Sequence, residues 1–244
     1  MRCIARLDIK NGNVIKGIHL EGLRIVGNPV SMARSYYEQG IEEVFLLDAV
    51  ASLYGTNHLY SVVEAVSSNV FVPIAVGGGI RSLSDVEKAL AAGADKVVIN
   101  TAAFENLRFI ESVAERFGSQ CVVGSVQAKA HKGDWLAYYA NGKERSNVRA
   151  IDWACSLESA GAGELIITSI DKEGTRRGFD TDLIESIVAS TKSPIVVSGG
   201  FGKPEHLSCF ASCRDISGVA IASVLHYNLL SIESIKLHRD GCLL

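Results

Sequence analysis

Short apolar runs alternate eight times with longer amphipathic runs along this chain, and this alternation limits the possible fold more than any other feature. The apolar runs predict strands at residues 3–8, 42–48, 70–79, 95–100, 120–127, 163–169, 193–200 and 218–223. Several of them are apolar almost throughout, as strands buried on both faces should be. Eight strand-then-helix units predict an α/β fold, a closed (β/α)8 TIM barrel rather than an open doubly wound sheet.

The segments between these runs carry helix patterns at 29–40, 82–93 and 107–118. Ser82 and Asp85 are spaced as in a capping box, and Gly40, Gly93 and Gly118 stand where these helices should end. The 244 residues suit one barrel of about 250 residues. Apolar residues make up 48% of the chain and aromatic residues only 7%, which favours a core of small and branched side chains. We predict a single domain over residues 1–244.

The two halves of the chain resemble each other at four places in the same order. LDIK (7–10) matches VQAK (126–129), and GIEEVFLLD (40–48) matches GAGELIITS (161–169). VGGGIRSLSDV (76–86) matches VSGGFGKPEHL (197–207), and KVVINTAAF (96–104) matches GVAIASVLH (218–226). Each offset is about half of the chain. We therefore predict a pseudo-twofold barrel built from half-barrels of about residues 1–120 and 121–244.

Two glycine loops indicate phosphate binding. Gly77–Gly79 follow the third predicted strand and Gly199–Gly200 follow the seventh, while Asn100–Thr101 and Ala222–Ser223 end the fourth and eighth. Glycines at such positions let backbone N–H groups approach an anion closely. One such loop could equally be a tight turn. Two loops related by the repeat favour a substrate with a phosphate at each end.

The candidate catalytic residues form an unequal pair. Asp8 ends the first strand, where a carboxylate of a barrel enzyme projects into the mouth; the alternative is a solvated loop residue or helix cap. Its counterpart in the repeat is Gln127, and a neutral amide cannot transfer a proton at ordinary pH. Asp48 and Asp171 also end strands and are candidate substitutes or ligands for substrate hydroxyls.

Charge and composition argue against several classes of partner. The formal net charge is −3, so no broad attraction to nucleic acid or anionic lipid is implied. No apolar run reaches the roughly 18 residues of a membrane span, and no secretory segment precedes the first strand. The six cysteines form no CxxC pair and the six histidines are scattered singly. We therefore expect a cytoplasmic protein with reduced thiols, no metal and no cofactor.

Seven stretches together resemble the cyclase subunit of imidazole glycerol phosphate synthase over essentially the whole chain. They are LDIKNGNVIKG, GIEEVFLLDAVAS, VGGGIRSLSDV, GADKVVINTAAF, FGSQCVVG, GAGELIITSIDKEGTRRGFD and SGGFGKPEH. The resemblance implies a lyase or cyclase of histidine biosynthesis that binds a bisphosphorylated substrate at the C-terminal barrel face. It also implies a glutaminase subunit on the N-terminal face, whose ammonia crosses the barrel interior.

The resemblance implies a role for each matching residue. Asp8 matches the first of two catalytic aspartates, and Gln127 stands where the second is expected. Lys16 matches a mobile substrate-closing loop after the first strand. The implied phosphate contacts are Gly79, Asn100, Thr101, Gly200 and Ser223, and the implied substrate contacts are Thr168 and Ser198. Arg6 occupies a position expected to be small, and Ser146–Asn147 stand where Thr-Gly is expected.

Four charged residues match the salt-bridge ring of the ammonia entrance in this family. They begin the first, second, fourth and sixth strands and are Arg2, Glu43, Lys96 and Glu164. Two cations and two anions can close a ring with no net charge, which tolerates burial beneath a partner. Ordinary solvated charges at strand starts are the alternative for any one of them.

Three hypotheses about function stay open at this point. The chain is a cyclase subunit that tolerates Gln127, with a rate lowered by about 10²–10⁴, the usual contribution of a general acid or base. Alternatively it is a paralogue that conducts ammonia for the amidination of a sugar in surface (lipopolysaccharide) polysaccharide biosynthesis. A third hypothesis is a scaffold that activates the glutaminase without catalysing a reaction. Whether the chain is itself an enzyme is therefore left undecided.

Overall fold

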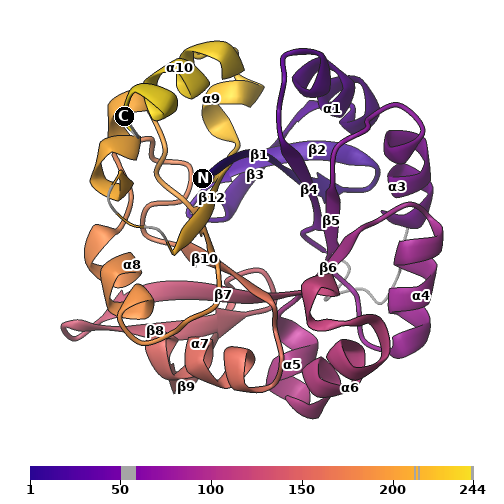
Figure 1. Ribbon diagram of the computed structural model, residues 1–244, viewed down its shortest axis with the longest axis vertical. Helices are drawn as coiled ribbons and strands as arrows, with labels where there is room; N and C mark the ends of the chain where they lie inside the picture. The colour runs from indigo at the N-terminus through magenta and orange to yellow at the C-terminus, as the bar shows by residue number, and fades with distance from the viewer. Residues whose placement is uncertain (51–58, 212, 214, 243–244) are drawn as a thin grey trace.

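The computed structural model describes residues 1–50, 59–211, 213 and 215–242. The last two residues of the family stretch at 40–52 lie outside the described residues. Eight parallel strands form the barrel (Figure 1): β1 (Arg2–Lys10), β4 (Glu43–Asp48), β5 (Ile74–Gly77), β6 (Lys96–Ile99), β7 (Val122–His131), β10 (Glu164–Ser169), β11 (Ile195–Ser198) and β12 (Ile216–Ile221). β1 pairs with β12 and β7 pairs with β10, so the sheet closes on itself. The predicted (β/α)8 barrel is confirmed.

Helices surround the strands as an outer ring (Figure 1). They are α1 (Pro29–Glu38), α3 (Leu59–Ser67), α4 (Leu83–Ala91), α5 (Thr101–Glu105), α6 (Arg108–Phe117), α7 (Ala150–Ser159), α8 (Thr181–Val188), α9 (Ser223–His226) and α10 (Ile232–Cys242), with 3-10 turns η1 (Ser119–Cys121) and η2 (Pro204–Phe210). The three helices predicted from the sequence are confirmed as α1, α4 and α6. The Ser82–Asp85 capping box is present at the start of α4, and the predicted glycines follow the three helix ends with positive φ.

Two β-hairpins extend the barrel at its mouth, where the sequence pattern predicted loops. β2 (Asn13–Ile18) and β3 (Glu21–Gly27) extend β1, while β8 (Asp134–Tyr139) and β9 (Glu144–Arg149) extend β7. The loop assignment for Lys16 was wrong, since this residue lies on β2. The reversal between β2 and β3 is made by His19 and Leu20 with φ of 53° and 63°. Neither residue type signals a tight two-residue turn, which explains why the sequence did not reveal the hairpin.

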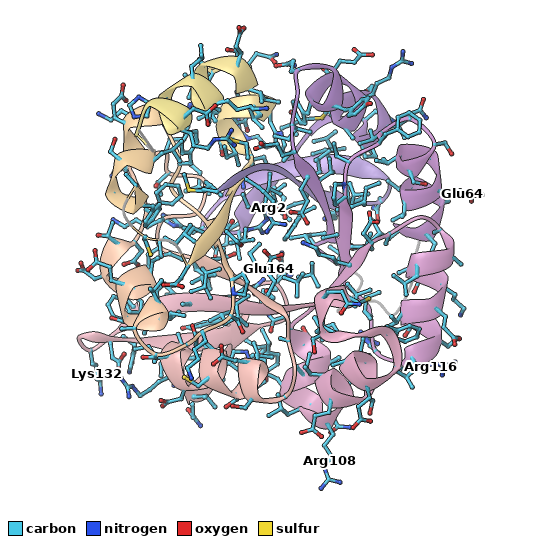
Figure 2. All side chains as sticks on the ribbon, in the orientation of Figure 1. Arg2, Glu64, Arg108, Arg116, Lys132 and Glu164 are labelled. Carbon is cyan, nitrogen blue, oxygen red and sulfur yellow. The ribbon has the colours of Figure 1, made fainter. Side chains whose placement is uncertain are left out.

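Side chains fill the barrel interior in layers, because every second residue of a strand points inward. Along β1 the inward residues are Arg2, Ile4, Arg6 and Asp8. Ile4 belongs to an apolar layer with one buried residue from each barrel strand: Ile4, Phe45, Ala75, Val98, Val123, Ile166, Val196 and Ala220. Figure 2 shows Arg2 and Glu164 pointing into the centre of the barrel. The interior therefore runs from a charged layer through an apolar layer to a second charged layer.

The backbone supports the internal repeat. Asn100 precedes α5 with φ and ψ of −129° and −81°, and Ala222 precedes α9 with −131° and −79°. These values are unusual and nearly identical, and the two residues are counterparts in the sequence repeat. β1 and β7, also counterparts, each continue into a hairpin. The division into half-barrels at about residue 120 remains a prediction.

Candidate functional site

The first glycine loop lies in a cavity at the C-terminal mouth of the barrel. Gly78 and Gly79 have φ of 94° and 73°, and a Cβ on Gly78 would overlap the carbonyl oxygen of Asp48. Asn100 and Thr101 line the same cavity. Only glycine can therefore follow this path, and the two polar residues expected beside the loop do lie there.

The second glycine loop has the same construction on the other side of the mouth. Gly199 and Gly200 have φ of 93° and 101°, and a Cβ on Gly200 would overlap the carbonyl oxygen of Gly178. Both glycines line a small cavity with Ser198 and the buried Ser223. Within each set, the structure thus brings together the residues that the sequence repeat singled out, and the two sets lie on different sides of the mouth.

Part of the first set is already hydrogen-bonded to the hairpin after β7. The Thr101 hydroxyl accepts from the backbone N–H of Ala140 at 3.1 Å, and Asn100 Nδ2 donates to the carbonyl of Tyr138 at 3.3 Å. Asn100 Oδ1 is buried and has no hydrogen-bond partner among the described residues. These two side chains therefore fix the hairpin beside the glycine loop and leave one acceptor unused.

Asp8 and Gln127 both line the mouth cavity. Asp8 is largely buried and accepts a hydrogen bond from Arg6 Nε at 3.0 Å. Gln127 Oε1 is buried without a hydrogen-bond partner among the described residues. The counterparts of the repeat thus lie in one site, one as a paired carboxylate and one as an amide with an unused acceptor.

Arg6 spans the interior just below the mouth. Its side chain is 3% exposed, and its Nη1 donates to Ser198 Oγ at 2.9 Å and to Thr168 Oγ1 at 3.3 Å. Burial acts to lower the pKa of this guanidinium, but Asp8 and Glu173 outweigh burial and raise it. Arg6 is therefore a permanent cation that links β1 to β10 and β11.

Lys16 and Glu173 complete a buried network of four charges. Lys16 Nζ contacts Glu173 Oε1 and lies 3.7 Å from Asp8 Oδ2. Glu173 Oε2 lies 3.7 Å from Arg6 Nη1. Burial alone would raise the pKa of Glu173, yet Lys16 and Arg6 lower it to about 2. Two cations and two anions cancel here, so the floor of the mouth has no net charge.

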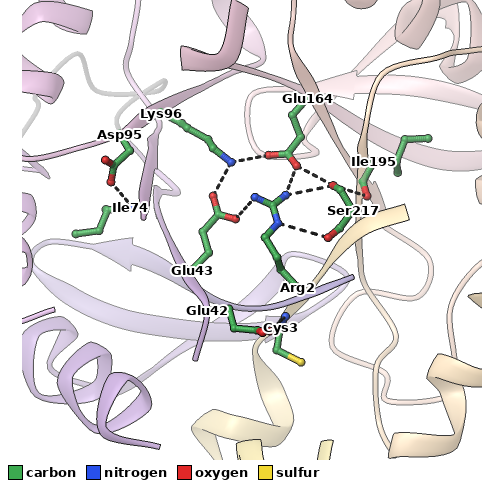
Figure 3. A network of polar contacts seen from close by, with 10 residues as sticks. All are labelled: Arg2, Cys3, Glu42, Glu43, Ile74, Asp95, Lys96, Glu164, Ile195 and Ser217. Atoms are coloured by element: carbon green, nitrogen blue, oxygen red, sulfur yellow. Dashed lines mark hydrogen bonds and ion pairs between the residues drawn. The ribbon is translucent and has the colours of Figure 1, made fainter. Parts of the chain in front are cut away.

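At the opposite end of the barrel, the four predicted ring residues form a closed ring of ion pairs (Figure 3). Arg2 Nη1 lies 2.7 Å from Glu43 Oε2, and Lys96 Nζ lies 2.8 Å from Glu43 Oε1 and 2.9 Å from Glu164 Oε2. Arg2 Nη2 contacts Glu164 and closes the ring. Ser217 Oγ donates to Glu164 Oε1 at 2.7 Å. The sequence did not reveal the role of Ser217, because a single serine at a strand start carries no distinctive signal.

The two acids of the ring differ in protonation behaviour. Burial raises the pKa of Glu43, whose side chain is fully buried, and Lys96 and Arg2 only partly oppose this. For Glu164, burial also acts to raise the pKa, but Lys96, Arg2 and Ser217 outweigh it and the pKa is lowered. Glu164 is therefore the more firmly ionised member of the ring.

Comparison with known proteins gives a consistent assignment. Residues 2–231 match the family model described as histidine biosynthesis protein. An imidazole glycerol phosphate synthase subunit HisF from Legionella pneumophila is 52% identical over 209 residues, covering 85% of this chain and 99% of that protein. HisF proteins from Saccharolobus solfataricus and a Hydrogenobaculum species are 41% and 42% identical, covering 96% of this chain and 94% of each relative.

The chain belongs to the HisF family. The resemblance found in the sequence is thereby confirmed, and with it the link to imidazole glycerol phosphate synthase and histidine biosynthesis. The names of these relatives describe a subunit of a larger enzyme.

Within this HisF-family chain, the other carboxylates near the mouth are already engaged. Asp48 ends β4, lines the mouth cavity and accepts from the backbone N–H of Val50 at 2.8 Å. Asp171 accepts from the backbone N–H of Ala130 at 2.7 Å. Glu173 is ionised and paired. Of the three, only Asp48 lines the cavity that contains Gln127, so it is the best placed to substitute for the missing carboxylate.

His226 is a further buried group beside this network, and the sequence did not single it out. Its Nδ1 lies 2.9 Å from the Tyr36 hydroxyl, and burial, followed by the charge of Lys16, lowers its pKa to about 4. It is therefore neutral at ordinary pH. A lone histidine in an apolar helix gave no signal that could have identified it.

Two general features complete the description of this HisF-family chain. Within the part of the chain that the structure describes, no group of three His, Cys, Asp or Glu side chains is arranged to hold a metal ion. No described helix is long and apolar enough to cross a membrane.

Proposed function

We propose that this chain is the ammonia-using barrel subunit of an imidazole glycerol phosphate synthase-type enzyme, acting on a bisphosphorylated substrate at the C-terminal mouth. One observation carries the proposal. The barrel has a closed ring of charged side chains at one end of its interior and two glycine loops at the other end. The names of the HisF relatives support the same reaction family.

The proposal assigns the N-terminal face to a glutaminase partner. The ring carries two charges of each sign, on Arg2, Glu43, Lys96 and Glu164. A partner can therefore cover it without burying a net charge. Above the ring, the apolar layer that includes Ile4 and Phe45 favours neutral ammonia over ammonium, since burying an unpaired cation is costly. Ammonia released by the partner would pass upward to the mouth.

At the mouth, Gly79 and Gly200 mark the two proposed phosphate sites, with Thr101 and Ser223 beside them. Asp8 is the proposed acid or base, and Lys16 lies over it at 3.7 Å. Gln127 can orient a substrate group but cannot exchange a proton with it. We therefore expect a site that binds the substrate but has a lowered cyclase rate.

The deciding experiment is a cyclase assay on the bisphosphorylated substrate with excess ammonium salt, in which free ammonia replaces the partner. We expect the native chain to be slow, by about 10²–10⁴ relative to a HisF protein with two aspartates. Gln127→Asp should recover part of this deficit, and Gln127→Glu, whose carboxylate is displaced by one methylene, should recover less. Turnover at a normal HisF rate in the native chain would show that the second carboxylate is dispensable.

A second candidate function is favoured by Arg6 together with Gln127. These residues place a cation and a neutral amide where the family pattern leads us to expect a small residue and a carboxylate. In this alternative the chain conducts ammonia to a different acceptor, such as a sugar that is amidinated for a surface polysaccharide. This second function would be favoured over the cyclase function if Gln127→Asp produced no cyclase activity while the chain still stimulated the glutaminase.

The scaffold hypothesis differs in one measurable respect. A scaffold that only activates a glutaminase has no need of the two glycine loops, whereas both candidate enzymes must bind phosphate there. Calorimetric titration with the bisphosphorylated substrate separates them. Absence of measurable binding would support the scaffold.

A further inference from the structure

Arg6 has hydrogen-bonding capacity that the described residues do not use. Its Nε donates to Asp8 and its Nη1 donates to Thr168 and Ser198. Among the described residues, none accepts a hydrogen bond from Nη2. The side chain is almost fully buried and lines the mouth cavity. Because Arg6 lines this cavity and Nη2 is not fully enclosed by protein, a ligand oxygen in the cavity can accept a hydrogen bond from it.

On the cavity side, β7 presents no carboxylate to this cation. In the repeat, Ser125 is the counterpart of Arg6 and Gln127 is the counterpart of Asp8, and both line the same cavity. Gln127 Oε1 is itself buried without a partner among the described residues. The half of the site that faces the guanidinium is therefore neutral and incompletely hydrogen-bonded, as expected of a site completed by a ligand.

The charges around Arg6 permit an anion to enter. Arg6 and Lys16 balance Asp8 and Glu173. An entering carboxylate therefore meets no net negative charge in this network. Asp48 and Arg81, one charge of each sign, also line the cavity. A guanidinium presents N–H donors in the planar geometry that suits a carboxylate, which strengthens the preference for this group over a hydroxyl.

We propose that Arg6 is a specificity-determining residue that binds a carboxylate of a phosphorylated substrate at the centre of the mouth. This inference rests on the phosphate sites of the proposed function and names the substrate class of its second candidate, an organic phosphate that also carries a carboxylate. The phosphate occupies a glycine loop and the carboxylate accepts from Nη2. A side chain that merely tied β1 to β10 and β11 would not discriminate between such ligands.

Matched ligand pairs test this directly on the full chain by calorimetric or NMR titration. The first pair is 3-phosphoglycerate and glycerol 3-phosphate, and the second, longer pair is 6-phosphogluconate and glucitol 6-phosphate. Within each pair only a carboxylate is exchanged for a hydroxymethyl group. We expect the acid of at least one pair to bind about tenfold more tightly or better, as one charge-assisted hydrogen bond provides.

Arg6→Met should reduce that ratio to about one while the alcohol phosphate keeps its affinity, which also reports that the variant is folded. Arg6→Lys keeps the charge but has no second terminal nitrogen, so most of the preference should be lost. This variant keeps the test decisive if the methionine variant does not fold. Arg34→Met, which removes an exposed cation from α1, is the matched control and should keep the full preference.

The outcomes separate this inference from the proposed function. Equal binding of acid and alcohol in both pairs, or a preference that survives in both Arg6 variants, would overturn the role of Arg6 and leave the phosphate sites standing. No binding of either alcohol phosphate or acid would overturn both. The inference is supported if the preference for the acid is lost in the Arg6 variants and kept in Arg34→Met.

Discussion

Glu173 offers the sharpest test of the buried charge network. The carboxylate is buried, contacts Lys16 and lies 3.7 Å from Arg6. Glu173→Gln keeps the size of the side chain and removes its charge, leaving two buried cations with Asp8 as their remaining partner. Because removing one member of a buried ion network leaves uncompensated charge, we expect a substantial loss of stability.

The magnitude follows from the pKa of Glu173. Its ordinary value of 4.5 falls to about 2 in the folded chain. At about 1.4 kcal/mol per pH unit, this difference corresponds to about 3 kcal/mol of folding free energy. Because the folded-state pKa is depressed, this stability is present above pH 4.5 and is lost as the pH falls towards 2. The burial of Glu173 means that solvent screening reduces this figure little.

The assay is urea unfolding of native chain and variant at pH 7 and at several lower values. We expect Glu173→Gln to lower the free energy of unfolding by about 3 kcal/mol at pH 7, and the gap between the proteins to narrow below pH 4.5. Asp171→Asn is the matched control, two residues away in the same segment. Its carboxylate makes one hydrogen bond to the backbone N–H of Ala130, which an asparagine oxygen can replace, so we expect a loss below about 1 kcal/mol.

A double-mutant cycle that combines Glu173→Gln with Lys16→Met measures the interaction energy between these two side chains. If the network is coupled, the two single losses should together exceed the loss of the double variant by about 1–3 kcal/mol. Additive losses, or a Glu173→Gln variant within about 1 kcal/mol of the native chain at pH 7, would refute the reasoning that these charges are mutually compensating.

Two further predictions concern the glycine loops and the ring. Gly200→Ala should cost about 2 kcal/mol or more and weaken phosphate binding, because its φ of 101° and its contact with the Gly178 carbonyl leave no room for a Cβ. Gly12→Ala, at φ of 73° with nothing within 4 Å, should cost only about 1 kcal/mol in the same urea titration; equal losses would contradict the steric argument. Lys96→Met should cost about 3–5 kcal/mol because Glu43 and Glu164 lose their shared cation, whereas the exposed Lys88→Met should change stability by less than about 0.5 kcal/mol. A stable Lys96→Met variant would mean that the ring charges are solvated in the uncomplexed barrel.

The sequence was sufficient to predict the barrel and the positions of its glycine loops. Strands buried on both faces are almost entirely apolar, and their recurrence eight times allowed few other folds. The repeat by itself related the loop at Gly79 to the loop at Gly200, because both loops follow matching apolar strands. The sequence also indicated that a carboxylate is missing at Gln127, because the repeat pairs this position with Asp8.

The tertiary structure decided what these residues contact. Thr168 and Ser198 stay predicted substrate residues, and only the folded chain shows that both accept hydrogen bonds from Arg6. Lys16 was assigned to a mobile loop, but it is buried on β2 against Glu173. No local pattern reports such pairs, because residues far apart in the chain meet only when the barrel closes. The turn at His19–Leu20 was equally hidden, since its positive φ values are imposed by the pairing of β2 and β3 rather than by residue type.

The sequence by itself thus determined the fold class, the repeat and the composition of both barrel ends, because periodicity and residue type are properties of the chain. Only the tertiary structure decided that Arg6 crosses the interior, that Glu173 is held ionised, and that Gln127 Oε1 finds no donor within the described part of the chain. These are consequences of burial and of distance between strands. Charge and hydrogen bonding acquire their strength only when side chains from several strands are brought together away from water.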